Sequence, residues 1–116
     1  MIVKKYKDVK EEKVTMEGAK GAHIQWLISD KDDADNFAMR RFRIEKDGYT
    51  PFHKHPHEHE TYILSGEGVM VTEDGEKEIS EGSFVFVKPY EKHQFKNTGD
   101  KELIFLCMIP MINKEC

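Results

Sequence analysis

The sequence has no apolar run long enough to cross a membrane. Its longest run, Leu103 to Ile109, ends at Pro110 and falls far short of the roughly 20 residues that a bilayer-spanning helix needs. The first residues, Met1 to Tyr6, also lack the hydrophobic stretch of a secretory signal peptide. We therefore expect a cytoplasmic protein that has no membrane partner.

An excess of positive charge is also missing. Lysine and arginine total 18 residues and aspartate and glutamate total 22, which gives a net charge of −4 with histidine neutral. Affinity for nucleic acids rests largely on clustered basic charge, whereas the basic residues of this chain are interleaved with acids. The composition excludes a nucleic-acid partner and leaves a small molecule as the expected ligand.

Cysteine is scarce, because only Cys107 and Cys116 occur and they stand nine positions apart. Without a CxxC arrangement, the chain can form neither a zinc ribbon nor a thioredoxin-like redox motif. We expect two free thiols, of which Cys116 is a frayed terminal residue without a function.

What the sequence does contain is a series of short segments with a period of two, punctuated by Gly, Asp and Asn. Its 116 residues suit a single domain over 1–116. The period predicts an all-β sandwich or barrel. Asp47-Gly48 is expected to end one strand as a turn, and Asp74-Gly75 is a strong hairpin signal. The expected strands are residues 22–29, 37–45, 61–64, 68–73, 77–80, 83–87, 93–96 and 102–109.

Four of the six histidines fall within seven positions, His53 to His59. On a strand, side chains two apart share a face, so His53 and His55 can direct two imidazoles to one point. Pro56 interrupts strand pairing and lets the chain bend before His59 returns to the same side. His93 opens a later strand and can complete the set from across a barrel, and neutral imidazole is the commonest metal-ligating side chain.

Two other histidines are not expected to ligate a metal. His57 lies beside Pro56 in the bend and is predicted to be a non-ligand. His23 stands alone on an alternating strand, where a structural or exposed role is expected.

The histidine spacing resembles the two sequence motifs of the cupin superfamily. In the first motif, His53-x-His55 is followed after three residues by His59, in the place of a glutamate, and after six more by Gly66. The opening glycine of that motif falls on Asp47, and Gly48 follows it.

The second cupin motif begins with a glycine, reaches a histidine eleven positions later and an asparagine four positions after that. Gly82, His93 and Asn97 fit this frame, although the internal proline is displaced by one to Pro89. The resemblance covers most of the chain. It implies a double-stranded β-helix, that is, a jelly-roll barrel, with a metal ion held inside.

A ligand set of four histidines is similar to that of the small single-domain cupins that bind manganese. The resemblance implies one divalent metal ion on His53, His55, His59 and His93, with manganese first and iron second. Imidazole also suits Zn, Ni, Co and Cu, so the ligand chemistry alone leaves the metal open.

Walls for a substrate pocket are expected from two strands whose alternation points inward. One set contains Arg40, Phe42 and Ile44, and the other contains Phe105, Cys107 and Ile109. Arg40 is either a clamp for a carboxylate or enolate or one member of a salt bridge at the rim. Cys107 is either a polar group near the metal or a small buried hydrophobic residue. Strand aromatics mostly fill cores, and we expect the same of the residues Phe84, Phe86 and Phe95.

The leading functional hypothesis is a metal-dependent enzyme, an oxidoreductase of dioxygenase type, that acts on a small organic molecule. Two alternatives stay open. One is a Lewis-acid isomerase or hydrolase with Glu58 or Glu60 as its base. The other is a cupin that binds or senses a small molecule or the metal without catalysis. A homodimer is expected, because exposed edge strands favour pairing and the apolar run 108–112 can contribute to an interface.

Overall fold

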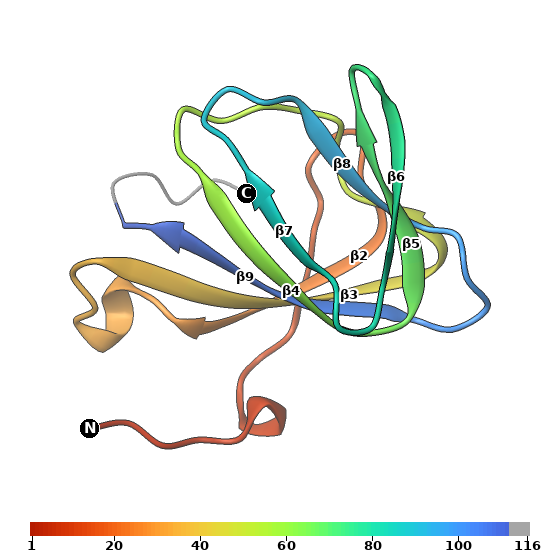
Figure 1. Cartoon of the computed structure of the whole chain (residues 1–116). Helices are drawn as coiled ribbons and strands as arrows, with labels where there is room; N and C mark the ends of the chain where they lie inside the picture. Colours follow the sequence, from red (N-terminus) through yellow and green to blue (C-terminus); the bar gives the residue numbers. More distant parts are fainter. Residues whose placement is uncertain (112–116) are drawn as a thin grey trace.

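The all-β prediction is confirmed by the computed structural model, which describes residues 1–111 and is drawn in Figure 1. Cys116 and the last residue of the apolar run 108–112 lie outside this part of the chain. The strands are β1 (Glu12–Lys13), β2 (Lys20–Ile28), β3 (Phe37–Tyr49), β4 (His59–Ser65), β5 (Glu67–Thr72), β6 (Gly75–Ser80), β7 (Phe84–Val87), β8 (His93–Asn97) and β9 (Leu103–Pro110). Two short 3-10 helices, η1 (Tyr6–Asp8) and η2 (Asp30–Asp32), complete these elements. Neither of them, nor any other stretch of residues 1–111, forms a helix of the length and apolarity needed to cross a membrane.

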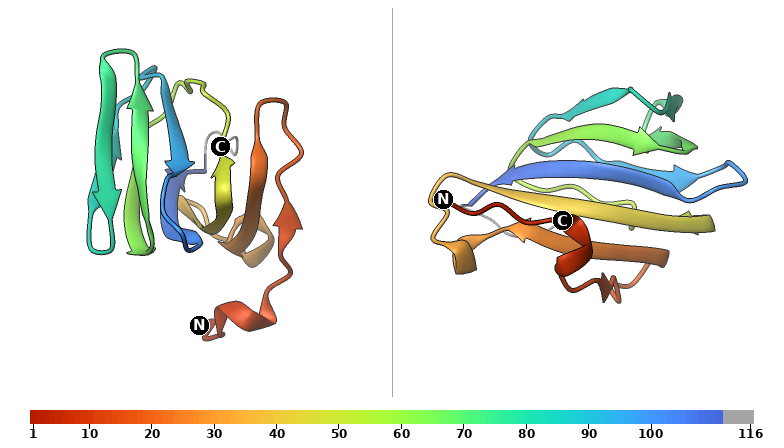
Figure 2. Two further views of the ribbon diagram at one scale, coloured as in Figure 1. Left: turned by 90° about the vertical axis from the view of Figure 1, so that its right-hand side faces the viewer. Right: turned by 90° about the horizontal axis from the view of Figure 1, so that it is seen from below.

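The strands form one antiparallel sheet in the order β6-β5-β8-β3-β9-β4-β7, with β2 added to β3 and β1 added to β2. Figure 2 shows that the sheet curls, so that the layer containing β5, β6 and β8 faces the layer containing β4, β7 and β9. The strands β6 and β7 stand at the two ends of the order. The curl therefore encloses an interior between the layers and leaves these two strands as edges.

Alternating side chains fill the interior, as the period of two predicts. Along β9, residues Leu103, Phe105, Cys107 and Ile109 are buried and their neighbours are partly exposed. Phe42 pairs with Phe105 and Arg40 pairs with Cys107 across β3 and β9. The predicted inward orientation of both strands is confirmed, because Arg40, Phe42 and Ile44 are buried as well.

Three local expectations differ from the structure. Strand β3 does not end at Asp47-Gly48 but continues to Tyr49. The hairpin between β5 and β6 forms as predicted, but Thr72 pairs with Gly75, so its loop is one residue earlier than expected. Phe95 is buried as predicted, whereas Phe84 and Phe86 are 82% and 51% exposed because their side chains lie on the outer face of β7.

Candidate metal centre

Five of the six histidines gather in one cluster. His59 begins β4 and His93 begins β8, whereas His53, His55 and His57 lie in the connection between β3 and β4. Apart from one isolated bridge at His53, residues 50–58 contain no strand. The expectation that His53 and His55 share the face of a strand is therefore wrong, and tertiary contacts of the connection bring their rings together instead.

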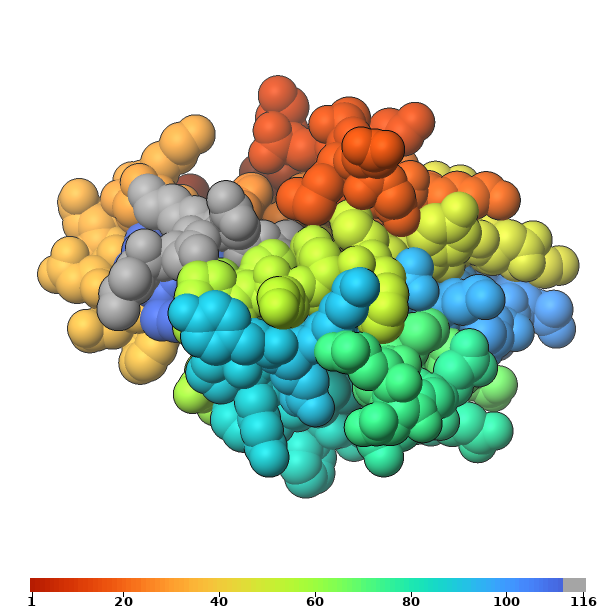
Figure 3. Space-filling model, turned by 90° about the horizontal axis from the view of Figure 1, so that it is seen from above, coloured from red at the N-terminus to blue at the C-terminus, as the bar shows by residue number. Residues whose placement is uncertain are grey.

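Backbone hydrogen bonds fix the connection to the segment that precedes β8. The N–H of His53 donates to the carbonyl of His93 at 3.1 Å, and the N–H of His93 donates back at 2.9 Å. The N–H of Tyr90 donates to the carbonyl of His55 at 2.6 Å. Figure 3 shows residues 50–58 at the surface between the N-terminal segment and the β7–β8 connection. The two cupin-like motifs thus meet through their main chains.

The four histidines predicted as ligands lie close together. Five of the six pairs among them have ring centroids between 4.2 and 5.8 Å apart. The ring nitrogens of His53, His55 and His93 lie within 4.8 Å of one another, an arrangement that can hold a metal ion. The structure therefore brings the predicted set together.

His57 was expected to stand outside the set, but the structure places its ring in the same cluster. It is buried, its centroid lies 4.9 Å from that of His59, and its ring nitrogens approach those of His55 and His59 within 4.8 Å. The bend at Pro56 does not turn the side chain to solvent, because residues 50–58 fold over the interior. That His57 is not a ligand stays a prediction.

His93 is oriented by a hydrogen bond from its own ring. Nδ1 lies 2.8 Å from the carbonyl oxygen of Glu91, which can only accept, so this nitrogen carries the proton. The lone pair is then on Nε2, where a metal can bind. Such a hydrogen bond is the usual way in which a protein sets the tautomer of a metal-ligating histidine.

Buried ring nitrogens show that the cluster fits a metal ion. Among the described residues, no hydrogen-bond partner reaches Nδ1 of His55 or either ring nitrogen of His59. A buried polar atom without a partner costs about 1–3 kcal/mol. Each neutral imidazole offers one lone pair, which a divalent cation would bind, so the donor set matches the ion that the cupin resemblance implies.

The cluster is held in the neutral form that metal binding requires. Burial, reinforced by the positive charges around it, lowers the pKa of His59 to about 2 and that of His55 to about 4. Burial also lowers the pKa of His93, although the hydrogen bond to Glu91 opposes the effect. At neutral pH these imidazoles therefore offer lone pairs instead of protons.

Arg40 contributes to that positive surrounding. Its side chain is fully buried, at 0% exposure, so it does not lie at the rim. The guanidinium donates to Cys107 Sγ at 3.0 Å and lies 5.1 Å from the ring centroid of Phe42. Its charge adds to the lowering of the pKa values of His55, His59 and His93.

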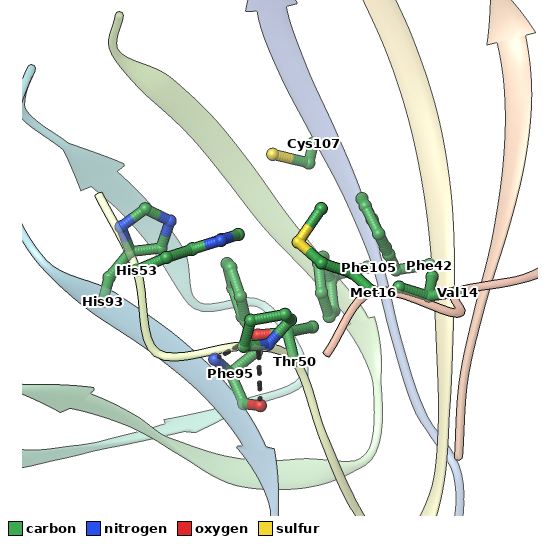
Figure 4. A pocket seen from close by; sticks show the side chains of 10 residues that line it. Val14, Met16, Phe42, Thr50, His53, His93, Phe95, Phe105 and Cys107 are labelled. Atoms are coloured by element: carbon green, nitrogen blue, oxygen red, sulfur yellow. Dashed lines mark hydrogen bonds between the residues drawn. The ribbon is translucent and has the colours of Figure 1, made fainter. Parts of the chain in front are cut away.

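Three of the four predicted pocket residues line a small cavity. Phe42, Phe105 and Cys107 face it together with His53 and His93, whereas Arg40 lies behind Cys107. Figure 4 shows His53 and His93 on one side and Phe42, Phe105 and Val14 on the other, with the side chain of Met16 between them. The cavity measures about 20 Å³, which is room for about one water molecule.

Sequence reasoning did not single out Thr61, whose Oγ1 lies 3.4 Å from Cys107 Sγ. The signal was available, because Thr61 follows His59 by two positions and therefore shares its inward face. Glu60, between them, faces outward and is exposed. Glu58 and Glu60 line a depression that His57 lines as well, at the edge of the histidine cluster.

Comparison with known proteins places the chain in a family. The family model described as Cupin domain matches residues 40–109. The oxalate-binding protein of Thermotoga maritima is 30% identical over 115 residues, which cover 97% of this chain and 95% of that protein.

Solved structures agree with this assignment. The polyketide cyclase RemF from Streptomyces resistomycificus superposes with a TM-score of 0.91 and 34% identity, covering 96% of this chain and 80% of that chain. A predicted oxalate decarboxylase from Thermotoga maritima superposes with a TM-score of 0.85 and 27% identity, covering 95% and 99% of the two chains. The motif spacing, the curled sheet and these similarities lead to one conclusion: the chain belongs to the Cupin domain family.

Proposed function

We propose that the protein binds one divalent metal ion through His53, His55, His59 and His93 and acts as a metal-dependent enzyme on a small organic molecule. The observation that carries the proposal is the buried ring of His59, whose two nitrogens have no hydrogen-bond partner within residues 1–111. Manganese is the first choice of metal through the cupin resemblance, followed by iron, with Zn, Ni, Co and Cu as further candidates.

A bound divalent ion would supply Lewis acidity and, if redox-active, electron transfer. Oxidoreductase chemistry of dioxygenase type is supported by the cavity of about 20 Å³ beside His53 and His93, which has the size of a water or dioxygen molecule. In this proposal the apolar walls contributed by Phe42, Phe105 and Cys107 exclude bulk water from that space.

Lewis-acid chemistry is the second candidate, and the charge of Arg40 supports it. Neutral imidazoles leave the full charge on a divalent ion, and the buried guanidinium near the cluster disfavours a further increase of positive charge on oxidation. The similarity to a polyketide cyclase also favours Lewis-acid chemistry. Activity retained with redox-inactive Zn²⁺ would select this candidate, and activity lost with Zn²⁺ but restored with Mn²⁺ or Fe²⁺ would select the oxidoreductase.

Binding without catalysis is supported by the similarity to an oxalate-binding protein over nearly the full chain. Calorimetric titration of the Mn²⁺-loaded protein with oxalate tests this alternative. Saturable binding of oxalate without its turnover supports a binding or sensing role, and turnover of oxalate contradicts it.

The metal site itself is tested by elemental analysis of tag-free protein purified without nickel resin. We expect about one equivalent of divalent metal in the native protein, its loss in the double variant His55→Ala, His93→Ala, and its retention in His23→Ala. His23 is a matched control because it lies on β2 beside Glu45, outside the cluster. A full equivalent of metal in the double variant, or none in the native protein, contradicts the proposal.

We also propose that the protein forms the predicted homodimer, and an exposed apolar surface supports this proposal. The outer face of the neighbouring strands β4 and β7 exposes the large apolar side chains Tyr62, Leu64, Phe84 and Phe86. In the run 108–112, by contrast, Ile109 is buried in the core and cannot contribute to an interface. We propose the β4–β7 face as the dimer surface and keep the cytoplasm as the expected location.

A further inference from the structure

A groove of about 510 Å³ opens between β6 and β7, the two end strands of the sheet order. Aliphatic side chains line its walls, with Met70 from β5, Ile79 from β6 and Val85 and Val87 from β7. Thr72, Ser83 and His93 line it as well, and so do the charged residues Lys77, Glu78 and Glu91. Apolar walls with convergent polar groups are the usual composition of a small-molecule site.

Strand register shows that the groove reaches the histidine cluster. Val87 is the cross-strand partner of His59, and Thr72 is the cross-strand partner of His93. Side chains of directly opposed residues stand about 5 Å apart on the same face of the sheet. Two of the proposed metal ligands therefore adjoin residues of the groove, one from each layer.

The small cavity on the other side of His93 cannot take an organic molecule. Its volume of about 20 Å³ suits only a water-sized molecule, and Val14 and Met16 of the N-terminal segment line it. The groove between β6 and β7 offers about 510 Å³ beside the same histidine. The groove therefore offers an organic ligand of the metal centre far more room than the small cavity does.

We propose that this groove is the substrate-binding site, and that its ligand is an organic molecule with oxygen donors at one end and an apolar body. The proposal rests on the metal-dependent function given above, because the oxygen donors are assigned to the ion held by His59 and His93. The apolar body lies between Ile79 on one layer and Val85 on the other, where its burial favours binding.

A pair of hydroxamates tests the groove, because acetohydroxamate and benzohydroxamate share one metal-chelating group and differ in a methyl against a phenyl group. Dissociation constants are measured from the visible spectrum of the Co²⁺-loaded full chain. We expect benzohydroxamate to bind about tenfold more tightly than acetohydroxamate to the native protein. In Val85→Asp that ratio falls to about one, because a carboxylate on the wall of the groove opposes burial of the phenyl group.

Val14→Asp is the matched control. Val14 and Val85 are both half-buried valines packed against the core, but Val14 lines the small cavity and Val85 lines the groove. The ratio should remain near tenfold in Val14→Asp. Equal affinities of the two hydroxamates for native protein, or a ratio lost in Val14→Asp and kept in Val85→Asp, overturn the proposal.

A measurement on the native chain avoids dependence on the folding of either variant. With Zn²⁺-loaded protein, benzohydroxamate should shift the methyl resonances of Ile79 and Met70 through its ring current and leave those of Val14 unchanged. Shifts confined to Val14 and Met16 would contradict the groove as the binding site. They would leave the proposed metal centre unaffected. Failure of the chain to bind Co²⁺ or Zn²⁺ removes the metal centre and this inference with it.

Discussion

His59 shows how a buried side chain can be kept for function at a cost in stability. It is 2% exposed, and neither ring nitrogen has a hydrogen-bond partner among residues 1–111. We predict that His59→Leu raises the unfolding free energy of the metal-free protein by about 1–3 kcal/mol, because the unsatisfied polar atoms disappear. The same variant should lose the increase in Tm that Mn²⁺ gives the native protein. Calorimetry with and without a chelator measures both effects.

The control for that prediction is His23→Leu, which removes a histidine that hydrogen-bonds to Glu45. This variant should keep the Mn²⁺-dependent increase in Tm and gain no stability without metal. Retention of the full increase in Tm by His59→Leu would falsify the role assigned to His59.

The lowered pKa values of His55 and His59 predict how the metal-free protein responds to acid. Below pH 6.5 the unfolded chain takes up protons on both residues, whereas the folded chain does not until pH falls to about 4 for His55 and about 2 for His59. Stability is therefore greatest above pH 6.5 and falls as pH decreases from there toward 4. Each such proton contributes a slope of about 1.4 kcal/mol per pH unit.

Urea unfolding in the presence of a chelator at pH 7.5, 6 and 5 measures this slope. His55→Gln should show a shallower dependence than the native protein, because one of the groups whose pKa is lowered by burial is gone. An unfolding free energy that stays level between pH 7.5 and 5 contradicts the buried, neutral state of these imidazoles.

Residue spacing predicted the candidate ligands better than it predicted their surroundings. His53, His55, His59 and His93 follow from the motif frame, and their rings do meet. The place of His57 could not be read from the sequence, because it depends on how the β3–β4 connection folds over the interior. Arg40 was expected to point inward, but its donation to Cys107 Sγ is set by pairing across two strands distant in sequence.

Hydrogen bonds hold the connection between β3 and β4 to β8, although the connection has no regular structure. The N–H of Phe95 donates to Thr50 Oγ1 at 2.9 Å, and the N–H of Thr50 donates to the carbonyl of Phe95 at 2.9 Å. His53 follows three residues later and exchanges two backbone hydrogen bonds with His93. These bonds place the histidines of the connection against β8.

Thr50→Val tests that anchoring. Loss of the hydroxyl leaves the buried N–H of Phe95 without its acceptor, so we predict a loss of about 1–3 kcal/mol in unfolding free energy. We also predict weaker binding of Mn²⁺, measured by competition with a chelator, because His53 is less firmly held. Thr50→Ser keeps the hydroxyl and should retain the native Mn²⁺ affinity. Unchanged affinity in Thr50→Val would show that His53 is positioned independently of Thr50.

The strands themselves were predictable from alternation, and the main exception has a physical explanation. Asp47-Gly48 was expected to end a strand, yet Lys20 pairs with Tyr49 and Ala22 pairs with Ile44, so the extra residues form a bulge within β3. Asp47 has a φ of 66°, and a Cβ on Gly48 would lie 2.6 Å from the carbonyl oxygen of Lys20. The same residues that favour a turn also favour a bulge, and only the partner strand distinguishes the two.

At the scale of the whole molecule, strand order determines which strands face each other, and the local alternation of side chains does not contain that information. β6 and β7 are separated by only a few residues in the chain but stand at opposite ends of the sheet order. Curling of the sheet brings these two ends to the sides of one groove. Alternation identifies the inward residues of each strand, but the facing of Ile79 and Val85 across this groove depends on pairings that span the chain.

The exposed aromatic surface of β7 gives a prediction about assembly. Phe84 and Phe86 are 82% and 51% exposed on an end strand, and Tyr62 pairs with Phe84 on the neighbouring strand. A second copy that covers this face would bury the rings and protect the strand edge at once. We predict that native protein is a dimer by light scattering and that Phe84→Glu, Phe86→Glu is a monomer, because charges in a buried apolar interface are strongly unfavourable.

The double variant should keep its full metal content, since the inward residues Val85 and Val87 are unchanged. Phe37→Glu, a change at an exposed phenylalanine at the start of β3, is the matched control and should remain dimeric. A dimer that persists in the double variant would place the interface elsewhere on the molecule.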